Sequence, residues 1–151
     1  MTERQRESQG TTAARVTALV TADPLDLAGH ESAVGRGAAG AVVSFAGVVR
    51  DHDDGRGVLE LEYEAHPSAQ QILAEVAAEI AADPEVYALA VSHRIGRLKI
   101  GDVALAAAVS TAHRAAAFAA CARLVDEVKA RLPVWKRQLF ADGTEEWVNC
   151  P

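Results

Sequence analysis

Hydrophobic and polar residues alternate along several stretches of the chain, which is the pattern of strands with one buried face. Such alternation, or a run rich in β-branched residues, predicts strands at residues 15–21, 41–50, 58–65, 87–95, 103–111, 134–140 and 145–149. The segment 58–65 (VLELEYEA) follows the turn sequence DHDDGRG, so we expect it to pair with 41–50 as a hairpin. Gly47 within the earlier strand predicts a bulge or a close backbone approach.

Two stretches with helical periodicity have recognisable starts. Pro24 suits a first helical position and predicts a short helix that ends near Ser32. Ser68 and Gln71 form an S-x-x-Q capping box, which predicts the start of a second helix. We expect this second helix to end at Asp83-Pro84, because proline lacks the amide hydrogen that a helix needs.

The longest helical stretch covers residues 112–132. Apolar residues at helical spacing predict that its buried stripe consists of Phe118, Cys121, Val125, Val128 and Leu132. We interpret Cys121 as a small core residue and not as a nucleophile. Pro133 does not continue a helix, so Lys129 falls in the last turn.

The order of these elements is a hairpin, a helix, two strands, a helix and a second hairpin. This order predicts an α+β fold with helices packed on a largely antiparallel sheet. The 151 residues are enough for one domain with a hydrophobic core. Residues 1–14 are polar, and we expect a disordered N-terminal tail followed by a single domain at 15–151.

Composition and charge exclude several classes of protein. Half of the residues are hydrophobic and the mean hydropathy is +0.03, which indicates a globular chain. A net charge of -6 argues against nonspecific nucleic-acid binding, which needs a basic surface. No apolar run approaches the roughly 18 residues of a membrane span, and the first residues lack the hydrophobic region of a secretory signal. Because Cys121 and Cys150 form no CxxC motif or disulfide framework, we expect a cytoplasmic protein.

Basic residues gather in one segment of this acidic chain, residues 129–138 (KARLPVWKRQ). The segment contains Lys129, Arg131, Lys136 and Arg137, out of 15 lysines and arginines in the whole chain. A local excess of positive charge on a negative background predicts an anion site. The alternative is that Lys129 only complements a helix C-terminus and that Lys136 and Arg137 lie on a solvated strand edge.

Two further places have side chains suited to an anion. Arg50 ends an expected strand, and His113 and Arg114 begin the longest helix. Amide groups at a helix N-terminus attract anions, arginine offers a fork that matches phosphate, and histidine exchanges protons near neutral pH. Taken singly, Arg50 is equally compatible with a surface charge, His113 with a helix cap and Arg114 with an ion-pair partner.

Two other segments are weaker candidates. His52 stands among three aspartates in DHDD, but the spacing matches no zinc site or EF-hand, so we expect an acidic turn and no metal. The glycine-rich segment GRGAAG at residues 35–40 lacks the Lys-Ser/Thr of a phosphate-binding P-loop. Neither segment predicts a cofactor site.

Five segments of the chain together resemble one family. VVSFAGVVRDH, SHRIGRLKIGD, STAHRAAAF, VKARLPVWKRQ and EEWVN resemble the large, catalytic subunit of molybdopterin synthase, from about Gly40 to Val148. The resemblance implies an α/β hammerhead-like single domain with an additional antiparallel β subdomain. It also implies a sulfurtransferase of molybdenum cofactor biosynthesis that converts a cyclic pyranopterin monophosphate into molybdopterin. The sulfur comes from the thiocarboxylated Gly-Gly tail of a small ubiquitin-like carrier subunit, and no metal or cofactor is required.

The resemblance also implies a set of site residues. By motif, the substrate-binding positions are Arg50, His113, Arg114, Lys129, Lys136, Arg137 and Gln138. Lys129 is the first candidate for the essential catalytic residue, Lys136 is the second, and His113 is the candidate proton shuttle. Gln138 departs from the family, which usually has glutamate there, so a carboxylate role at this position is not carried over.

Helix geometry divides these residues into two groups. About fifteen residues separate His113 and Arg114 from Lys129, which is about 22 Å along a continuous helix. A pocket for one small substrate does not reach both ends. Because the resemblance places both groups in one site, we expect a two-fold homodimer in which His113 and Arg114 of one chain complete the pocket of the other. A broken helix or a long substrate is the alternative. The resemblance also implies a heterotetramer with the carrier.

Two other functions fit the same residues. One is a different phosphate-handling acyl or sulfur transferase, which differs in its substrate. The other is a non-enzymatic α+β adaptor module that binds a ubiquitin-like partner through an exposed edge strand. The adaptor hypothesis predicts that Lys129 and Lys136 affect affinity but not turnover.

Overall fold

The computed structural model describes residues 13–149 of the chain. The strands are β1 (Arg15–Thr21), β2 (Ala41–Val48), β3 (His52–Asp53), β4 (Arg56–Ala65), β5 (Val86–Arg94), β6 (Gly96–Lys99), β7 (Val103–Thr111), β8 (Val134–Phe140) and β9 (Glu145–Asn149). The helices are α2 (Leu27–Val34), α3 (Ala69–Ala81) and α4 (Arg114–Arg131). Most of the tail expected at residues 1–14, and Cys150, lie outside the described residues.

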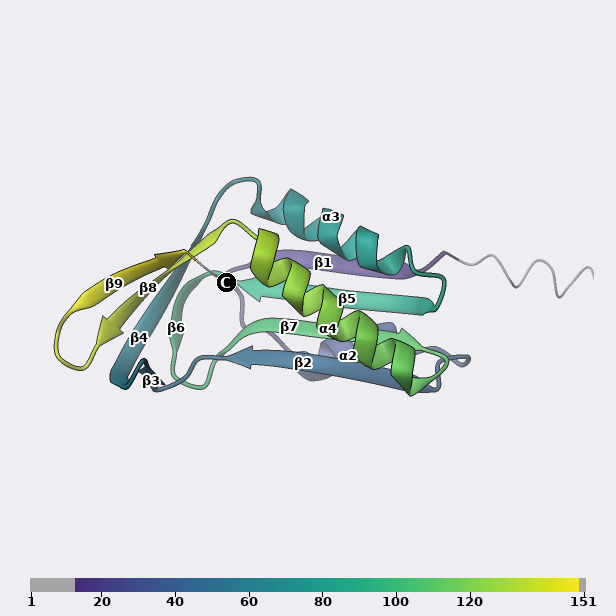
Figure 1. The fold of residues 1–151 in the computed structure, drawn as a ribbon, viewed down its shortest axis with the longest axis horizontal. Coiled ribbons are helices and arrows are strands. Elements are labelled where there is room, and N and C mark those ends of the chain that lie inside the picture. The colour runs from purple at the N-terminus through teal and green to yellow at the C-terminus, as the bar shows by residue number, and fades with distance from the viewer. Residues whose placement is uncertain (1–12, 150–151) are drawn as a thin grey trace, which may run out of the picture.

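The first sheet has four strands in the order β1-β5-β7-β2. β1 runs parallel to β5 and the other neighbours are antiparallel, which confirms the expected, largely antiparallel arrangement. Helices α3 and α4 pack across one face of this sheet and α2 packs on the other (Figure 1). The central strands β5 and β7 are buried along nearly their whole length, and the alanines of β7 (VALAAAVST) let helices approach closely on both sides.

The second sheet contains β3, β4, β8 and β9, with β6 also paired to β4. The predicted hairpin between 41–50 and 58–65 is therefore wrong, because β2 belongs to the first sheet and β4 to the second. The register of β2 shifts between Gly47 and Val48, as expected for a bulge. The Val49 amide then donates to the Asp102 carbonyl at 2.9 Å, and the Val49 carbonyl accepts from Gly101 at 2.9 Å. These bonds direct the chain out of the first sheet before β4 begins.

One hydrophobic core joins the two sheets. It contains Leu89 and Val109 from the first sheet, Leu61 and Val134 from the second, and Val128 from α4, all of them buried. The second sheet projects from one end of the first (Figure 1), and burial of this shared apolar surface fixes how the two sheets meet. The described residues thus form the predicted α+β fold.

Helix α4 is one continuous helix of 18 residues. It ends at Arg131, before Leu132 and Pro133, as the sequence predicts. The buried stripe differs from the prediction, because the Phe118 side chain is 62% exposed whereas Leu124 is fully buried. The first half of the helix, RAAAFAACA, is mostly alanine, so the sequence defines no single apolar face there.

Helix α2 begins at Leu27 and not at Pro24. Asp26 has extended backbone angles, and its carbonyl accepts the first helical bond, from the amide of His30 at 3.2 Å. Pro24 therefore lies in the connection before the helix. None of the helices within residues 13–149 is long and apolar enough to cross a membrane.

Helix α3 begins where the sequence predicts, but without the predicted capping box. The Ser68 side chain makes no cap bond and instead hydrogen-bonds to Nδ1 of His66 at 2.7 Å. The side-chain Nε2 of Gln71 donates to Oε1 of Glu75, one turn further along the helix, at 3.1 Å. The helix is held by its buried face, which includes Leu73 and other apolar residues, more than by its cap.

Candidate active site

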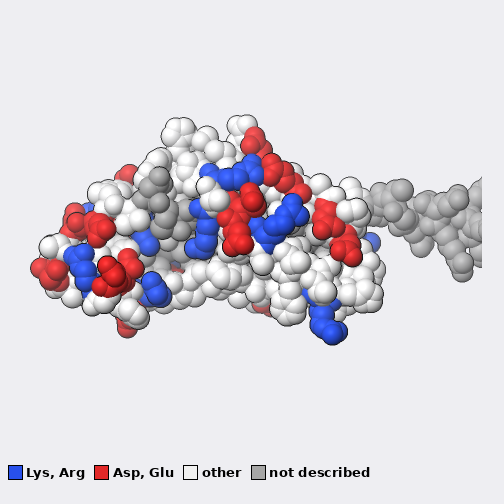
Figure 2. All heavy atoms as spheres, viewed as in Figure 1, with Lys and Arg blue, Asp and Glu red and all other residues white. Residues whose placement is uncertain are grey.

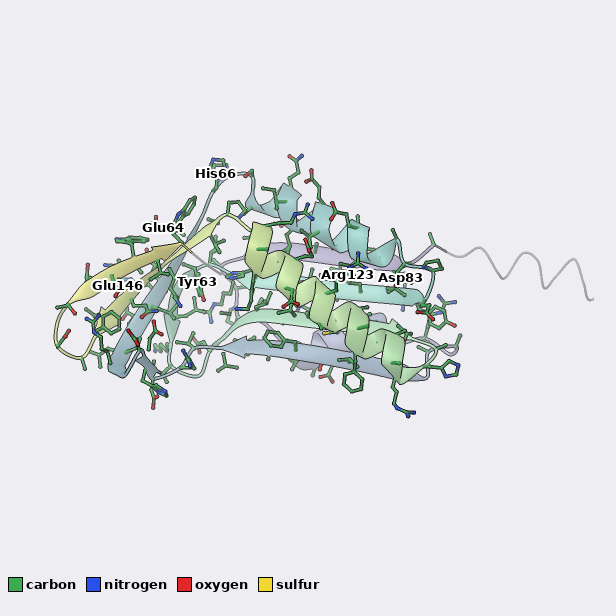
Figure 3. All side chains as sticks on the ribbon, in the orientation of Figure 1. Tyr63, Glu64, His66, Asp83, Arg123 and Glu146 are labelled. Atoms are coloured by element: carbon green, nitrogen blue, oxygen red, sulfur yellow. The ribbon has the colours of Figure 1, made fainter. Side chains whose placement is uncertain are left out.

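A pocket of about 280 Å³ lies where the two sheets meet. Its lining residues come from the end of β2, from β4, β5, β7 and β8, and from the last turn of α4: Gly47, Val48, Arg50, Tyr63, His93, Ala104, Leu105, Lys129 and Lys136. Figure 3 shows Tyr63 near this junction. We call this site the cation pocket, because three positively charged side chains from separate segments of the chain converge on it.

Alternation along β8 decides which residues of the KRQ sequence face the cation pocket. One face of the strand carries four inward side chains: the buried Val134, Gln138 and Phe140 and the half-buried Lys136. Successive side chains of a strand point to opposite faces, so Arg137 lies on the other face. The structure thus places Lys136 and Gln138 inward and separates Arg137 from them.

Arg137 is held by ion pairs on the outer face of the second sheet. Its guanidinium donates to Glu62 at 2.8 Å and to Glu145 at 3.1 Å, and it lies over the ring of Trp147 at 5.9 Å. The hydrogen bond to Glu62 is the main cause that raises the pKa of Arg137. These contacts join β4, β8 and β9, so they support the sheet that carries Lys136.

The end of α4 brings Lys129 to the cation pocket. Val128, the preceding residue, is fully buried and fixes the last turn in the core, while Lys129 is exposed. Among the described residues, the side chains of Lys129 and Lys136 make no ion pair. Arg50 pairs with Asp53 at 3.6 Å, but 68% of its side chain is exposed, and such a surface pair contributes little. The pocket therefore keeps an excess of positive charge that suits an anion.

Arg131, the remaining member of the basic segment, has a structural role. It forms ion pairs with Glu79 of α3 and, at 3.5 Å, with Glu127 of its own helix. Over α3 and α4, Figure 2 shows basic side chains interspersed with acidic ones. Positive charge on this face is therefore largely compensated, in contrast to the cation pocket.

His93 lines the cation pocket, although the sequence did not single it out. Its side chain is 1% exposed, and its ring meets that of Tyr63 edge to face, with centroids 4.9 Å apart. Burial is the main cause that lowers the pKa of His93 to about 4; the hydrogen bond to Arg94 opposes this shift and the charge of Lys129 adds to it. The only sequence signal is a titratable residue at the end of the apolar run VYALAVSHR.

A smaller pocket of about 80 Å³ adjoins the cation pocket and shares Arg50 and Lys136 with it. Gln138 lines this smaller pocket, is 2% exposed and donates from Nε2 to Asp53 at 3.0 Å. Its Oε1 atom is buried and has no hydrogen-bond partner within the described residues. A buried acceptor without a partner suits a donor group from a ligand. Within residues 13–149 no cluster of His, Cys, Asp and Glu is able to hold a metal ion.

His113 and Arg114 lie at the opposite end of α4. His113 precedes the helix with extended backbone angles, its side chain makes no cap bond, and its carbonyl accepts a hydrogen bond from the Thr111 hydroxyl at 2.6 Å. Both side chains are exposed. His113 lines a separate pocket of about 210 Å³ with Glu85 and neighbouring residues. Within one chain, the structure therefore does not bring His113 and Arg114 to the cation pocket.

Known proteins match this chain over most of its length. Residues 20–131 match the family model described as MoaE protein. The molybdopterin synthase catalytic subunit of Nostoc sp. is 39% identical over 132 residues, which is 86% of this chain and 80% of that protein. The crystal structure of molybdopterin synthase from Staphylococcus aureus has a TM-score of 0.77 at 30% identity and covers 92% of this chain and 98% of that chain.

A complex of subunits 1 and 2 of the molybdopterin-converting factor from Helicobacter pylori has a TM-score of 0.66 at 18% identity, with 89% of this chain and 88% of that chain covered. At that identity the likeness concerns the fold alone. The match of the family model and the identity to the Nostoc protein decide the assignment. The chain belongs to the MoaE family, the catalytic subunits of molybdopterin synthase.

Proposed function

We propose that this chain transfers sulfur from the C-terminal thiocarboxylate of a small ubiquitin-like carrier to a cyclic pyranopterin monophosphate, forming the molybdopterin dithiolene. The observation that carries the proposal is the cation pocket, where Arg50, Lys129 and Lys136 converge without full compensation by acidic side chains. Membership of the MoaE family supports the same reaction. A cytoplasmic location is part of the proposal.

The charges of the cation pocket fit this reaction. The substrate carries a phosphate and the donor is an anionic thiocarboxylate, so two anions must approach each other. Fixed cations reduce this repulsion and stabilise the charge that develops on a phosphate oxygen when its bond to carbon breaks. The thiocarboxylate sulfur is itself the nucleophile. The protein is then required to position both anions and to stabilise charge, which lysine and arginine side chains do.

The positions of the side chains suggest a division of roles. Lys129 is exposed at the rim, where a carrier tail has access, and we assign it the principal catalytic role as a cation beside the acyl-sulfur adduct. Lys136 is its half-buried catalytic neighbour, and Arg50 binds the phosphate. The unpartnered Oε1 of Gln138 accepts a hydrogen bond from the substrate. Arg137 contributes to substrate binding through the position of β8.

A two-fold dimer brings the remaining residues to the site. β2 is an edge strand of the first sheet. Its first residue, Ala41, pairs with Thr111, close to His113, and its other end leads to Arg50. Antiparallel pairing of two β2 strands about a two-fold axis would place His113 and Arg114 of the second chain next to Arg50 of the first.

The surface beside β2 supports this dimer. An apolar hollow of about 420 Å³ lies between β2 and α4 and is lined by Phe45, Phe118 and Val125 among others. Val42 on β2 is 45% exposed. Exposed apolar residues of this kind beside an unpaired strand edge favour association with another chain. A second copy would cover them and complete the active site at once.

The carrier is proposed to approach the β8–β9 hairpin. β9 is the edge of the second sheet and carries the exposed Trp147, and the exposed Trp135 lies on β8, the strand that also carries Lys136. Aromatic side chains are common anchors of protein interfaces. A carrier tail that passes this edge reaches the cation pocket from the second sheet. With two chains and two carriers, the assembly is a heterotetramer.

Reconstitution tests the proposed function. The purified chain is mixed with a thiocarboxylated carrier and the cyclic pterin precursor, and the dithiolene product is measured after oxidation to its fluorescent derivative. We expect product only when all three components are present. Tight carrier binding without any product would favour the adaptor hypothesis. Product formed from a different phosphate-containing acceptor, and none from the pterin, would favour another transferase.

A further inference from the structure

His93 lines the cation pocket, and the proposed function assigns it no role. It lies at the end of β5, paired with Val20 of β1 and Leu105 of β7, both of which are apolar. The charged and titratable residues that line the cation pocket together with His93 are Arg50 after β2, Tyr63 on β4, Lys129 on α4 and Lys136 on β8. The side chain of the next residue, Arg94, is paired with Asp102 at 3.3 Å.

One hydrogen bond fixes the tautomer of His93. Its Nδ1 lies 2.8 Å from the carbonyl oxygen of Arg94. A carbonyl oxygen only accepts hydrogen bonds, so Nδ1 carries the proton. Because the pKa of His93 is lowered to about 4, the ring is neutral at neutral pH, and Nε2 carries a lone pair. The edge-to-face contact with Tyr63 holds the ring plane in place, at an interplanar angle of 84°.

This lone pair is chemically distinct from the other lining groups. At neutral pH the side chains of Lys129, Lys136 and Arg50 are cations, and a tyrosine keeps its proton. Among the residues that line the cation pocket, His93 is thus the one whose side chain carries an unprotonated basic nitrogen at neutral pH. Burial is the larger and the charge of Lys129 the smaller of the two causes that lower the pKa of His93. A bound anion offsets the charge of Lys129, and a negative charge nearby itself favours the imidazolium.

We propose that His93 is the proton carrier of the cation pocket: its Nε2 takes up a proton when an anion binds to the cationic side chains and releases it to the bound substrate. The assignment follows from the fixed tautomer, the position of the ring in the pocket wall and the three neighbouring cations. It places a proton carrier within the same chain as Lys129, independently of His113.

The role in catalysis rests on the proposed function. The thiocarboxylate sulfur supplies the electron pair of the new carbon–sulfur bond, and the carbon–oxygen bond of the cyclic phosphate breaks, with its electron pair going to oxygen. The proton on Nε2 of His93 passes to that oxygen, and the ring returns to the neutral Nδ1–H tautomer. The next anion that enters the pocket restores the imidazolium, with the proton taken from water.

Nitrogen NMR of the histidine side chains tests the proton uptake directly and without any activity. The probe is inorganic sulfate, an anion that does not itself exchange protons between pH 5 and 8. In the free protein we expect His93 to show the neutral Nδ1–H tautomer over this whole range. With saturating sulfate we expect its pKa to rise by about one unit or more. A His93 ring that stays neutral at pH 5 with sulfate bound would overturn the proposal.

Two variants separate proton transfer from packing. In Lys129→Ala the sulfate-induced rise in the pKa of His93 should shrink, because part of the field that the anion cancels is already absent. His93→Gln keeps an amide that can donate to the Arg94 carbonyl but carries no exchangeable ring proton. In the reconstituted reaction we expect His93→Gln to lower kcat about 100-fold, with the KM for the precursor changed only a few-fold.

The outcomes distinguish the two proposals. If the wild-type chain makes no product, the proposed function fails, and the NMR titration still decides the proton uptake. If the wild-type chain is active and folded His93→Gln retains the wild-type kcat, His93 is a packing residue and the proposal is wrong. Equal thermal midpoints of the wild-type and His93→Gln chains establish that the variant is folded.

Discussion

Mixing two inactive variants tests how the active site is assembled from two chains. Arg114→Ala removes a cation at the start of α4, and Lys129→Ala removes one near its end. The helix between them is continuous, and about fifteen residues at about 1.5 Å each place the two positions about 22 Å apart. The cation pocket of one chain holds Lys129 but does not reach Arg114 of the same chain.

The shared-site model predicts how much activity returns. Random exchange of equal amounts of the two variants gives about half mixed dimers, and a two-fold dimer has two pockets. In each mixed dimer one pocket contains both substitutions and the other contains neither. Half of the dimers therefore have one intact pocket of two, and the mixture should recover about a quarter of the wild-type activity.

The assay is the rate of product formation after subunit exchange, compared with each variant alone. The matched control mixes Lys129→Ala with Lys136→Ala, two substitutions that lie in the same pocket of one chain. Each mixed dimer then has one substitution in each pocket, so this mixture should recover no activity. Mass spectrometry with one isotope-labelled variant verifies that mixed dimers form. Mixed dimers of Arg114→Ala and Lys129→Ala that stay inactive would refute the shared site.

Four further predictions follow from individual residues. Arg50→Ala should raise the KM for the precursor more than it lowers kcat, and added salt should weaken precursor binding to the wild-type chain. A calorimetric affinity for the precursor that changes neither with Arg50→Ala nor with salt would contradict phosphate binding by Arg50. A carrier that lacks its last two glycines should lose activity and much of its affinity, and undiminished binding would indicate another docking surface. Leu124→Ala should lower the free energy of unfolding by about 2–5 kcal/mol in urea, because the side chain is fully buried, whereas Phe118→Ala should chiefly weaken dimerisation in sedimentation experiments. The pKa of His93 lies near 4 in the folded chain and near 6.5 in the unfolded chain, so the unfolded state binds a proton first as the pH falls. The free energy of unfolding should therefore decrease between about pH 7 and pH 4, by at most about 3 kcal/mol. This decrease should be smaller in His93→Gln.

The sequence predicts most strands and the long helix, because their signals are local. Pro133 ends α4, and the alternation in residues 134–140 predicts which side chains of β8 share a face. The sequence does not predict which strand pairs with which. Val58–Ala65 alternates as an ideal hairpin partner for the segment at 41–50, but the pairing of Glu62 with Arg137 in β8 depends on residues far away in the sequence.

The same distinction applies to the site. The KARLPVWKRQ segment and Arg50 indicate an anion pocket, and the structure brings Lys129, Lys136 and Arg50 together. His93 is not predicted, because one histidine at the end of an apolar strand has the same pattern whether it packs in a core or lines a pocket. Arg137 is adjacent to Lys136 in sequence, yet strand alternation turns it to the opposite face.

The proposed function depends most on the catalytic requirement for Lys129, and its removal is the most direct test. Lys99, the one lysine of the chain outside the cation pocket, is exposed on β6 and provides the matched control. With saturating thiocarboxylated carrier and precursor, we expect Lys129→Ala to lose nearly all product formation while Lys99→Ala keeps the wild-type rate and both keep the wild-type thermal midpoint. A Lys129→Ala chain that turns over at the same rate as Lys99→Ala would contradict the cation pocket as the site of sulfur transfer.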